Sequence, residues 1–379
     1  MEFQEINIEE YGASIELSRF HAGEVTEFHA MLHIDPRGET FADQLARLKK
    51  AEKHLTNLET LSGASTVFKR YFLSDATNQV PLINEDDQCT ISYIQQPPLD
   101  GSKIALWLYL QQGTNITHTA DSTIATHNGY SHIYTMGLTD SSADGSYVQT
   151  EKTLSAYMDI LKQHGATLAD NCIRTWFFVR DVDTQYAGLV KSRREIFIEQ
   201  GLTQDTHYIA STGIGGNPAD PKAIVQLGCY AITGFQPEQQ RYLYALTHLN
   251  KTYEYGVTFE RGTLMQYGDR NHIYISGTAS INNKGEVVHV GDIVNQTHRM
   301  WENVEKLLEE GGMGNDDIMQ IIVYLRDIAD YEVVKKMFEE KFPQTPYVVT
   351  LAPVCRPTWL IEMECIAVKA AVNNCFMAF

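Results

Sequence analysis

The strongest chemical signal in this sequence is a carboxylate in an otherwise apolar segment. Glu362 stands in the run Leu360–Val368, whose other members, apart from Glu364, are Leu, Ile, Met, Cys, Ala and Val. A buried carboxylate is costly unless it is paired or used, and burial raises its pKa. Glu362 is therefore a candidate proton donor near neutral pH. The alternative is a carboxylate at a solvated strand edge. Glu364 lies on the same face two residues later, and we interpret it as structural.

Three arginines could bind an anionic substrate. Arginine is the natural partner of a carboxylate because its planar guanidinium donates two parallel hydrogen bonds. Arg193 lies in a helical segment, Gly188–Arg194, where a solvated helix face is the alternative interpretation. Arg356 follows Cys355 and could be either a substrate clamp or a surface residue, and Arg261 is a third candidate.

Gly277 and Thr278 end a strand-like run, where a glycine lets a ligand approach the backbone, although a β-bulge would also explain it. Cys355 has no histidine near it in sequence, so we interpret it as a small buried hydrophobic residue rather than a nucleophile. We predict no metal and no cofactor. The histidine-rich stretch lacks zinc-site spacing, and the glycine-rich stretch lacks the Lys-Ser/Thr of a phosphate loop; these stretches contain His118, His127 and His132, and Gly213, Gly215 and Gly216.

The elements that would position these residues recur three times along the chain. Residues 320–327 read Gln-Ile-Ile-Val-Tyr-Leu-Arg-Asp, residues 174–181 read Arg-Thr-Trp-Phe-Phe-Val-Arg-Asp, and residues 68–75 form a more degenerate copy. Each copy has strand character and follows a segment with helical spacing of apolar residues. The strand that carries Glu362 has Gln226 at the matching position of the second copy and only apolar residues in the first. This asymmetry predicts one active cleft.

The repeats predict an α+β fold of three units of hairpin strands, helix, strand, helix and strand. We place the units at residues 1–115, 116–238 and 239–379. No long Gly/Ser or Pro linker separates them, which favours a closed intramolecular pseudo-trimer over three separate domains.

Composition narrows the function classes. The 379 residues include 48 Asp and Glu against 30 Lys and Arg, a net charge of −18 that argues against a nucleic-acid partner. No apolar run is long enough to span a membrane. The N-terminal residues are acidic and polar, unlike a signal peptide, and the six cysteines are scattered without paired spacing. We expect a cytoplasmic protein with reduced cysteines.

The segments Ile275–Ser280, Val323–Asp327 and Ile361–Val368 resemble the RidA/YjgF superfamily, also described as endoribonuclease L-PSP-like. The resemblance is strong over residues 260–370, moderate over 125–235 and faint over 20–112. It implies chorismate-mutase-like units with ligand sites in the clefts between them, and hence a monomeric pseudo-trimer or a small oligomer of it.

The last two units resemble the chorismatase branch more narrowly, through Gly277–Ile281, His289–Asp292, Cys355–Arg356 before Leu360–Glu364, Ala210–Gly215 and Phe259–Gly262. The resemblance implies that Glu362 is the catalytic acid and that Arg193 binds a substrate carboxylate. It also implies a further carboxylate-binding arginine where this chain has Lys335 or Lys336. The RidA deaminases hold the substrate carboxylate with an arginine in the strand that precedes the strand of the catalytic glutamate. At that position this chain has Tyr347.

Together these patterns predict a hydrolase that cleaves the enolpyruvyl ether of chorismate or of a similar cyclic carboxylate and releases pyruvate. A RidA-type enamine or imine deaminase is the second hypothesis, which the missing arginine opposes. The third is a non-catalytic protein that binds small carboxylates, like the YjgF relatives named as translation inhibitors. The decisive expectation is geometric: Glu362 should be buried in a cleft between the middle and last units, with Arg193 facing it across that cleft.

Overall fold

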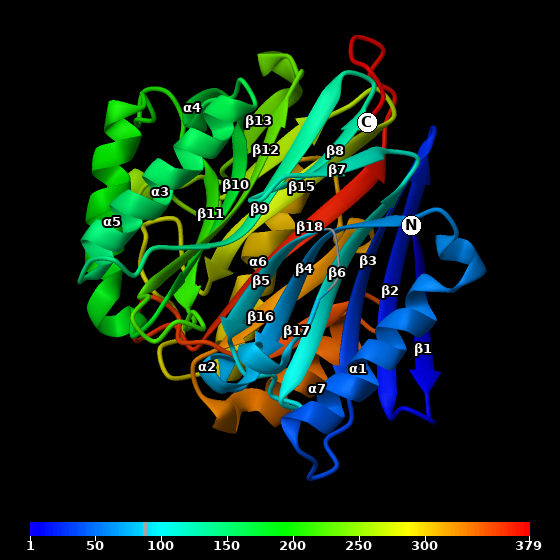
Figure 1. Cartoon of the computed structure of the whole chain (residues 1–379). Coiled ribbons are helices and arrows are strands. Elements are labelled where there is room, and N and C mark those ends of the chain that lie inside the picture. Colours follow the sequence, from blue (N-terminus) through cyan, green and yellow to red (C-terminus); the bar gives the residue numbers. More distant parts are fainter. Residues whose placement is uncertain (86–88) are drawn as a thin grey trace.

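The computed structural model describes residues 1–85 and 89–379, and in these residues the chain folds into three six-stranded mixed sheets, each covered by helices (Figure 1). The three sheets follow one another along the sequence and have the same strand order. This confirms the predicted α+β fold of three tandem units. Each unit also contains a short strand that the predicted order lacked, and it pairs in parallel with the strand of the repeated motif.

The first sheet has the order β1-β2-β3-β6-β4-β5. Of the strand pairs in this sheet, only β4 with β5 is parallel. Helix α1 packs on the sheet. Its elements are β1 Glu2–Ile8, β2 Ala13–Ala22, β3 Val25–Ile34, α1 Phe41–Thr56, η1 Glu59–Leu61, β4 Ser65–Leu73, α2 Ala76–Gln79, η2 Val80–Leu82, β5 Thr90–Gln95 and β6 Ile104–Gln112.

The second sheet has the order β11-β10-β12-β9-β8-β7 and carries two long helices that contact each other. Its elements are β7 Asn115–His118, β8 Thr123–His127, β9 Tyr130–Thr139, α3 Ser146–Gln163, α4 Leu168–Asn171, β10 Cys172–Val179, α5 Val182–Glu199, β11 Ala210–Gly215, β12 Val225–Thr233 and η3 Pro237–Gln239.

The third sheet has the order β13-β14-β15-β18-β16-β17. Its elements are β13 Gln240–Leu243, η4 Thr252–Tyr255, β14 Gly262–Gln266, β15 Arg270–Ala279, α6 Ile293–Glu310, η5 Asn315–Asp317, β16 Ile318–Leu325, η6 Ile328–Asp330, α7 Tyr331–Lys341, β17 Tyr347–Leu351 and β18 Ile361–Ala370.

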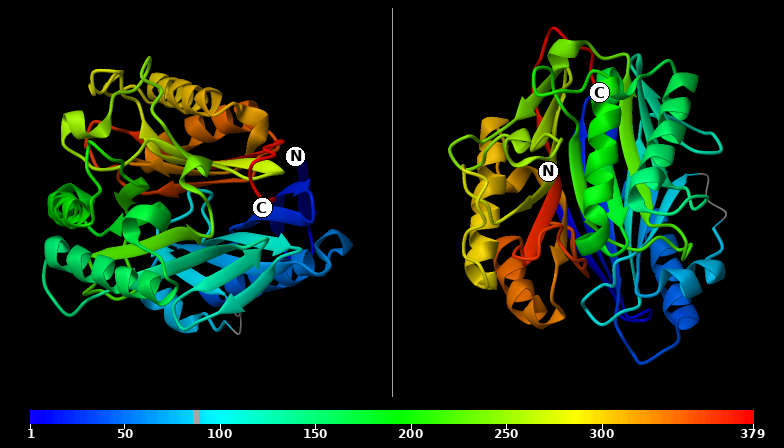
Figure 2. Two further views of the ribbon diagram at one scale, coloured as in Figure 1. Left: turned by 90° about the horizontal axis from the view of Figure 1, so that it is seen from above. Right: turned by 90° about the vertical axis from the view of Figure 1, so that its left-hand side faces the viewer.

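The three units close into a ring with the helices outside and the sheets facing inward (Figure 2). Strand β5 contacts β9, β11 contacts β15, and β16 contacts β3, so each unit touches both of the others. One hydrophobic core runs through the centre and takes residues from all three sheets, including Trp107, Trp176 and Met363. The predicted closed pseudo-trimer is therefore the observed architecture.

The strand register defines which positions are equivalent in the three units. In each unit we take the motif residue that lies three positions before the final aspartate, and ask which residue of the neighbouring strand pairs with it. The pairs are Phe72 with Ala105, Phe178 with Gln226, and Tyr324 with Glu362. Glu362 is thus the one carboxylate among the three equivalent positions.

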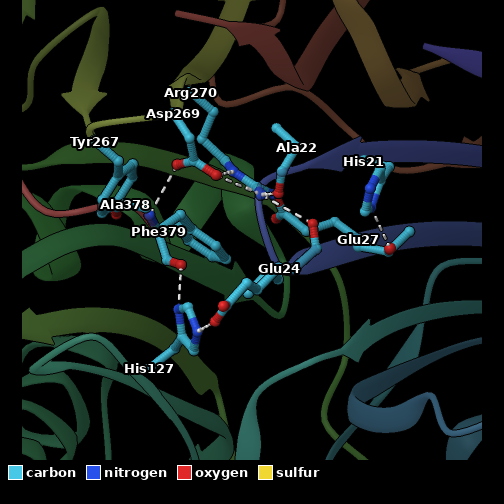
Figure 3. A network of polar contacts seen from close by, with 12 residues as sticks. His21, Ala22, Glu24, Glu27, His127, Tyr267, Asp269, Arg270, Ala378 and Phe379 are labelled. Atoms are coloured by element: carbon cyan, nitrogen blue, oxygen red, sulfur yellow. Dashed lines mark hydrogen bonds and ion pairs between the residues drawn. The ribbon is translucent and has the colours of Figure 1, made fainter. Parts of the chain in front are cut away.

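A buried polar network ties the units together near the chain's last residues (Figure 3). Arg270 Nη1 donates to Glu27 Oε1 at 2.7 Å, and the backbone nitrogen of Phe379 donates to Asp269 Oδ1 at 2.8 Å. His127 of the middle unit lies 2.5 Å from the Phe379 oxygen. Burial opposes the charge of Glu27, but His272 and Arg270 outweigh it and hold its pKa below the usual range. The network joins all three units through side chains that are far apart in sequence.

Across the described ranges, no helix combines the length and the apolar character that crossing a membrane requires.

Candidate active site

A cavity of about 490 Å³ lies between the middle and last units. One wall is helix α5 with strand β11 of the middle unit, and the other wall comes from β15, β18 and two loops of the last unit. It is lined by Val182, Asp183, Tyr186, Ala187, Val190, Lys191, Arg193, Arg194, Ser211, Gly213, Val257, Phe259, Arg261, Gly277, Ala279, Ile281, Cys355, Arg356, Trp359 and Glu362. A concave site that combines apolar walls with convergent polar groups is typical of a small-molecule site.

Glu362 lines this cavity from strand β18 and is 4% exposed. The described residues offer its carboxyl group no hydrogen-bond donor. Burial, and next the charge of Glu364, raise the pKa of Glu362 to about 8, against the opposing effect of Arg174 and Arg261. The carboxyl group is therefore largely protonated at neutral pH and opens onto a space that can hold a substrate.

Gly277 faces Glu362 from strand β15, and a β-carbon there would overlap Glu362 Oε1. The strand bulges at this point, because the register shifts between Ile275 and Thr278. Thr278 was expected beside the ligand, but its side chain is fully buried and donates to the carbonyl oxygen of Ser276 at 2.9 Å, and it does not line the cavity. Alternation along the strand turns Gly277 to the cavity and Thr278 away from it.

Two buried arginines line the cavity from opposite walls. Arg193 on α5 is 1% exposed, lies over the ring of Phe177 at 5.6 Å and donates to Ser211 Oγ at 3.4 Å. Arg261, which precedes β14, is 3% exposed, and its guanidinium donates to the backbone oxygen of Asn250 at 3.2 Å. The cavity therefore has a buried guanidinium group on either wall.

Arg356 and Cys355 lie in the loop before β18 and also line the cavity. The guanidinium of Arg356 lies 5.1 Å from the ring of Trp359. Removal from bulk water, and next the charge of Glu362, raise the pKa of the Cys355 thiol to about 12. A thiol of that kind is a poor nucleophile, so Cys355 is best understood as part of the cavity wall.

Lys335 does not belong to this site. It lies on α7 beside a different cavity of about 360 Å³ between the last and first units, together with Glu16, His33 and Asp100. Its ammonium group lies 3.8 Å from Glu339. The expectation was wrong because each cleft takes one wall from a neighbouring unit, so helix α7 faces the first unit and α5 faces the Glu362 strand.

Because each cleft takes one wall from a neighbouring unit, Tyr347 is also not the residue to compare with the arginine of the RidA deaminases. Tyr347 pairs with Ile321 on β16 and also lines the cavity between the last and first units. In the middle unit Ser211 pairs with Thr175, which is the equivalent position 146 residues earlier, and Ser211 lines the Glu362 cavity. The residue opposite Glu362 at this register is therefore Ser211, and it is not an arginine either.

Several lining residues were not singled out as site residues from the sequence. Tyr186, Lys191 and Arg194 extend the α5 wall around Arg193, and Trp359 with Phe259 supplies aromatic surface. Their spacing on α5 is an ordinary helical repeat, which gives no sign of a cavity until the last unit packs against it. Five cationic side chains, Lys191, Arg193, Arg194, Arg261 and Arg356, thus meet two carboxylates, Asp183 and Glu362.

Asp183 does not contribute free negative charge to the cavity, because Arg326 Nη1 and Nη2 donate to its two oxygens at 2.9 and 2.8 Å. This ion pair joins α5 to the last unit at one end, and Arg194 donates to the backbone oxygen of Gly256 at the other. The electrostatic character of the cavity is therefore positive and suited to an anionic ligand.

In the cleft between the first and middle units, Gln226 stands at the position that matches Glu362. Its Nε2 donates to Ser92 Oγ at 2.8 Å, and both side chains are buried. Among the described residues no group of His, Cys, Asp and Glu has the arrangement of a metal site.

Comparison with known proteins shows which family this chain resembles. Residues 264–369 match the family model described as endoribonuclease L-PSP. A RutC family protein of Pyrococcus abyssi is 36% identical over 102 residues, which cover 26% of this chain and 80% of that protein. The 3-aminoacrylate deaminase RutC of Acinetobacter baylyi is 33% identical over 100 residues, 26% of this chain and 79% of the deaminase.

Two further similarities extend beyond the last unit. The 3-hydroxybenzoate synthase of Streptomyces hygroscopicus is 27% identical over 239 residues, which cover 57% of this chain and 68% of the synthase. The crystal structure of a chorismatase superposes with a TM-score of 0.64 at 17% identity, covering 82% of this chain and 96% of the chorismatase, and so shares the fold. With the RutC proteins matched over most of their length, these similarities establish that the chain belongs to the RidA/YjgF superfamily, the endoribonuclease L-PSP-like family.

Proposed function

We propose that this enzyme is a hydrolase of the chorismatase type, which cleaves the enolpyruvyl ether of chorismate or of a similar cyclic carboxylate and releases pyruvate. The observation that carries the proposal is the buried carboxyl group of Glu362, whose pKa is raised to about 8 by burial and Glu364, in a cavity lined by five cationic side chains. Similarity to the 3-hydroxybenzoate synthase and the fold shared with a chorismatase support it.

The first chemical step uses Glu362 as general acid. Its proton passes to the terminal CH₂ carbon of the enol ether, the π electrons form the new C–H bond, and the ether oxygen stabilises the resulting oxocarbenium ion. Arg193 and Arg261 line the same cavity and would hold the substrate carboxylates, and the cations offset the negative charge left on Glu362.

Water completes the reaction. It adds to the cationic carbon and loses a proton, which returns to Glu362. The hemiketal then collapses to the keto group of pyruvate, and the ring oxygen leaves as a hydroxyl group. In this scheme the new oxygen of pyruvate comes from water and the ring keeps its own.

The test is pyruvate release from chorismate by the wild type and by Glu362→Gln. The substitution keeps the shape of the side chain but removes its acid function, so we expect release to fall at least 10²-fold, on the order of the contribution of a general acid. Lys335→Ala is the matched control, because Lys335 lies at another cavity, and it should leave the rate unchanged. In ¹⁸O-water the label should enter the pyruvate keto group. Unimpaired release by Glu362→Gln would reject the mechanism.

One observation favours a second candidate, a RidA-type enamine or imine deaminase. A stretch of 100 residues of this chain is 33% identical to the 3-aminoacrylate deaminase RutC. Ser211, a small neutral residue, occupies the register position opposite Glu362 and gives no cationic anchor there. Ammonia release from 3-aminoacrylate without pyruvate release from chorismate would favour the deaminase.

A further inference from the structure

Glu364 lies two residues after Glu362 on β18 and points to the same side of the sheet, but its surroundings are entirely different. It is 2% exposed and does not line the cavity. Trp176 Nε1 donates to its Oε1 at 2.8 Å, Arg174 Nη2 donates to its Oε2 at 2.8 Å, and Thr212 Oγ1 donates to the same Oε2. Both oxygens are therefore held in place, with hydrogen bonds of the charge-assisted kind.

The groups around Glu364 come from the other two units. Arg174 and Trp176 stand on β10 of the middle unit, and Arg70 stands on β4 of the first unit with Nη1 3.7 Å from Glu364 Oε1. Arg70 is fully buried and lies 5.1, 4.9 and 5.1 Å from the rings of Trp107, Trp176 and Phe178. In the described part of the chain its guanidinium has no hydrogen-bond partner. Glu364 is thus the anionic centre at which the three units meet.

Thr212 connects this centre to the cavity wall. Its hydroxyl group donates to Glu364, and its oxygen accepts a hydrogen bond from the backbone nitrogen of Gly277 at 2.9 Å. Gly277 in turn lies against Glu362. The two carboxyl groups are therefore held in fixed relative positions, one bonded on both oxygens and one open to the cavity.

We propose that Glu364 is a positioning residue for the proton donor: its fixed negative charge opposes a second negative charge on β18 and so keeps Glu362 in the acid form before substrate binds. This inference rests on the proposed function for its role in turnover, but the electrostatic relationship holds whatever the substrate. After burial, the charge of Glu364 is the largest contribution that raises the pKa of Glu362.

Other titratable and charged groups around Glu362 come from every element that packs on it. They are Glu364 on β18, Tyr324 on β16, Arg174 on β10, Asp183, Tyr186 and Arg193 on α5, and Arg261, Cys355 and Arg356 on the neighbouring loops. Arg174 and Arg261 lower the pKa of Glu362 and so oppose Glu364. Asp183 is paired with Arg326 and Glu364 with Arg174, but it is the charge of Glu364 that raises the pKa of Glu362. Neutralising Glu364 should therefore change the titration of Glu362.

The experiment measures the protonation of Glu362 directly and without substrate. The infrared absorption of its protonated carboxyl group is assigned as the band that Glu362→Gln abolishes, and this band is followed against pH. Glu364→Gln keeps the shape and the oxygen that accepts from Trp176 but removes the charge. We expect the Glu362 titration to move down by about one pH unit or more. Glu364→Asp keeps the charge and should keep the titration near that of the wild type.

The substitution Arg70→Met should shift the Glu362 titration in the opposite direction. Arg70 makes no hydrogen bond within the described residues, so this change removes the positive charge beside Glu364 without breaking a hydrogen bond and leaves more of the Glu364 charge to act on Glu362. The Glu362 titration should then move up. It also keeps the test decisive if Glu364→Gln does not fold, which circular dichroism and a melting curve would reveal.

Turnover supplies the second readout. The alkaline limit of kcat/KM for pyruvate release should move down in Glu364→Gln by the same amount as the infrared titration, with KM at pH 6 nearly unchanged, whereas a purely structural role would lower the rate at every pH. A folded Glu364→Gln with an unshifted Glu362 band, or an Arg70→Met shift in the downward direction, would overturn the positioning role. Shifted bands in an enzyme that releases no pyruvate would reject the proposed function and leave the positioning role standing.

Discussion

Gly277 and Glu362 approach so closely across strands β15 and β18 that a β-carbon on the glycine would overlap a carboxylate oxygen of the glutamate. The backbone nitrogen of Gly277 is fixed by Thr212 at 2.9 Å, so the glycine cannot move away freely. A cavity wall without a side chain at this point leaves the carboxyl group of Glu362 in its position and leaves room for a ligand beside it.

Gly277→Ala should therefore displace the Glu362 carboxyl group. Because small displacements of a catalytic group are costly, we expect kcat to fall by about 10²-fold, and the overpacked methyl group should reduce stability by about 1–3 kcal/mol. Steady-state kinetics and chemical denaturation would measure both effects. Gly314→Ala is the control, because a β-carbon at Gly314 meets no atom within 4 Å, and it should be near neutral. Wild-type kinetics in Gly277→Ala would contradict the close contact.

The pH dependence of turnover should follow the protonated form of Glu362. Burial, and next Glu364, raise the pKa of Glu362 to about 8, so kcat/KM should be level below that pH and fall about tenfold per pH unit above it. Initial rates of pyruvate release from about pH 6 to 9.5 would check this. The residual activity of Glu362→Gln should lack the alkaline fall. A rate that rises through pH 8 would mean that Glu362 acts first as a base.

The same raised pKa predicts a cost in stability. The folded state holds the Glu362 proton up to about pH 8, whereas in the unfolded chain the carboxyl group loses it near the ordinary value of 4.5. The contribution of this proton to the free energy of unfolding is therefore fully present below about pH 4.5 and is lost as the pH rises towards 8. Glu362→Gln is neutral at every pH and should exceed the wild type in free energy of unfolding by about 1–3 kcal/mol at pH 8.5, as judged from the pKa scale with allowance for relaxation.

Urea denaturation at pH 5 and pH 8.5 would measure this difference, with Glu362→Gln approaching the wild type at pH 5. Comparing the variant with the wild type at the same pH cancels the contributions of all other titrating groups. A gain that is equal at both pH values would show that packing, and not protonation, separates the two proteins.

Arg193 should determine substrate binding. Arg193→Lys keeps the charge but cannot form two parallel hydrogen bonds with a carboxylate, and we expect KM to rise about 10- to 100-fold with a smaller effect on kcat. The measurement is the KM for chorismate in initial-rate assays. Arg180→Lys is a suitable control, because Arg180 donates to the backbone oxygens of Ala223 and Pro218 away from the cavity. An unchanged KM in Arg193→Lys would place the carboxylate on other cations.

The sequence alone determined the architecture, because the three motif copies and their helices carry local periodicity that does not depend on partners. It also identified Glu362, since a carboxylate in an apolar strand is visible without any contact being known. The same holds for Gln226 and the apolar first unit, which already indicated that the three clefts differ.

What the tertiary structure decided is which unit completes which cleft. Lys335 and Tyr347 were compared with the Glu362 strand because they share its unit, yet they line the cavity towards the first unit, while Ser211 and helix α5 of the middle unit face Glu362. The partners of Glu364 likewise come from two other units. These relationships join residues more than a hundred positions apart, and long-range packing between repeats leaves no local pattern in the sequence from which they could be predicted.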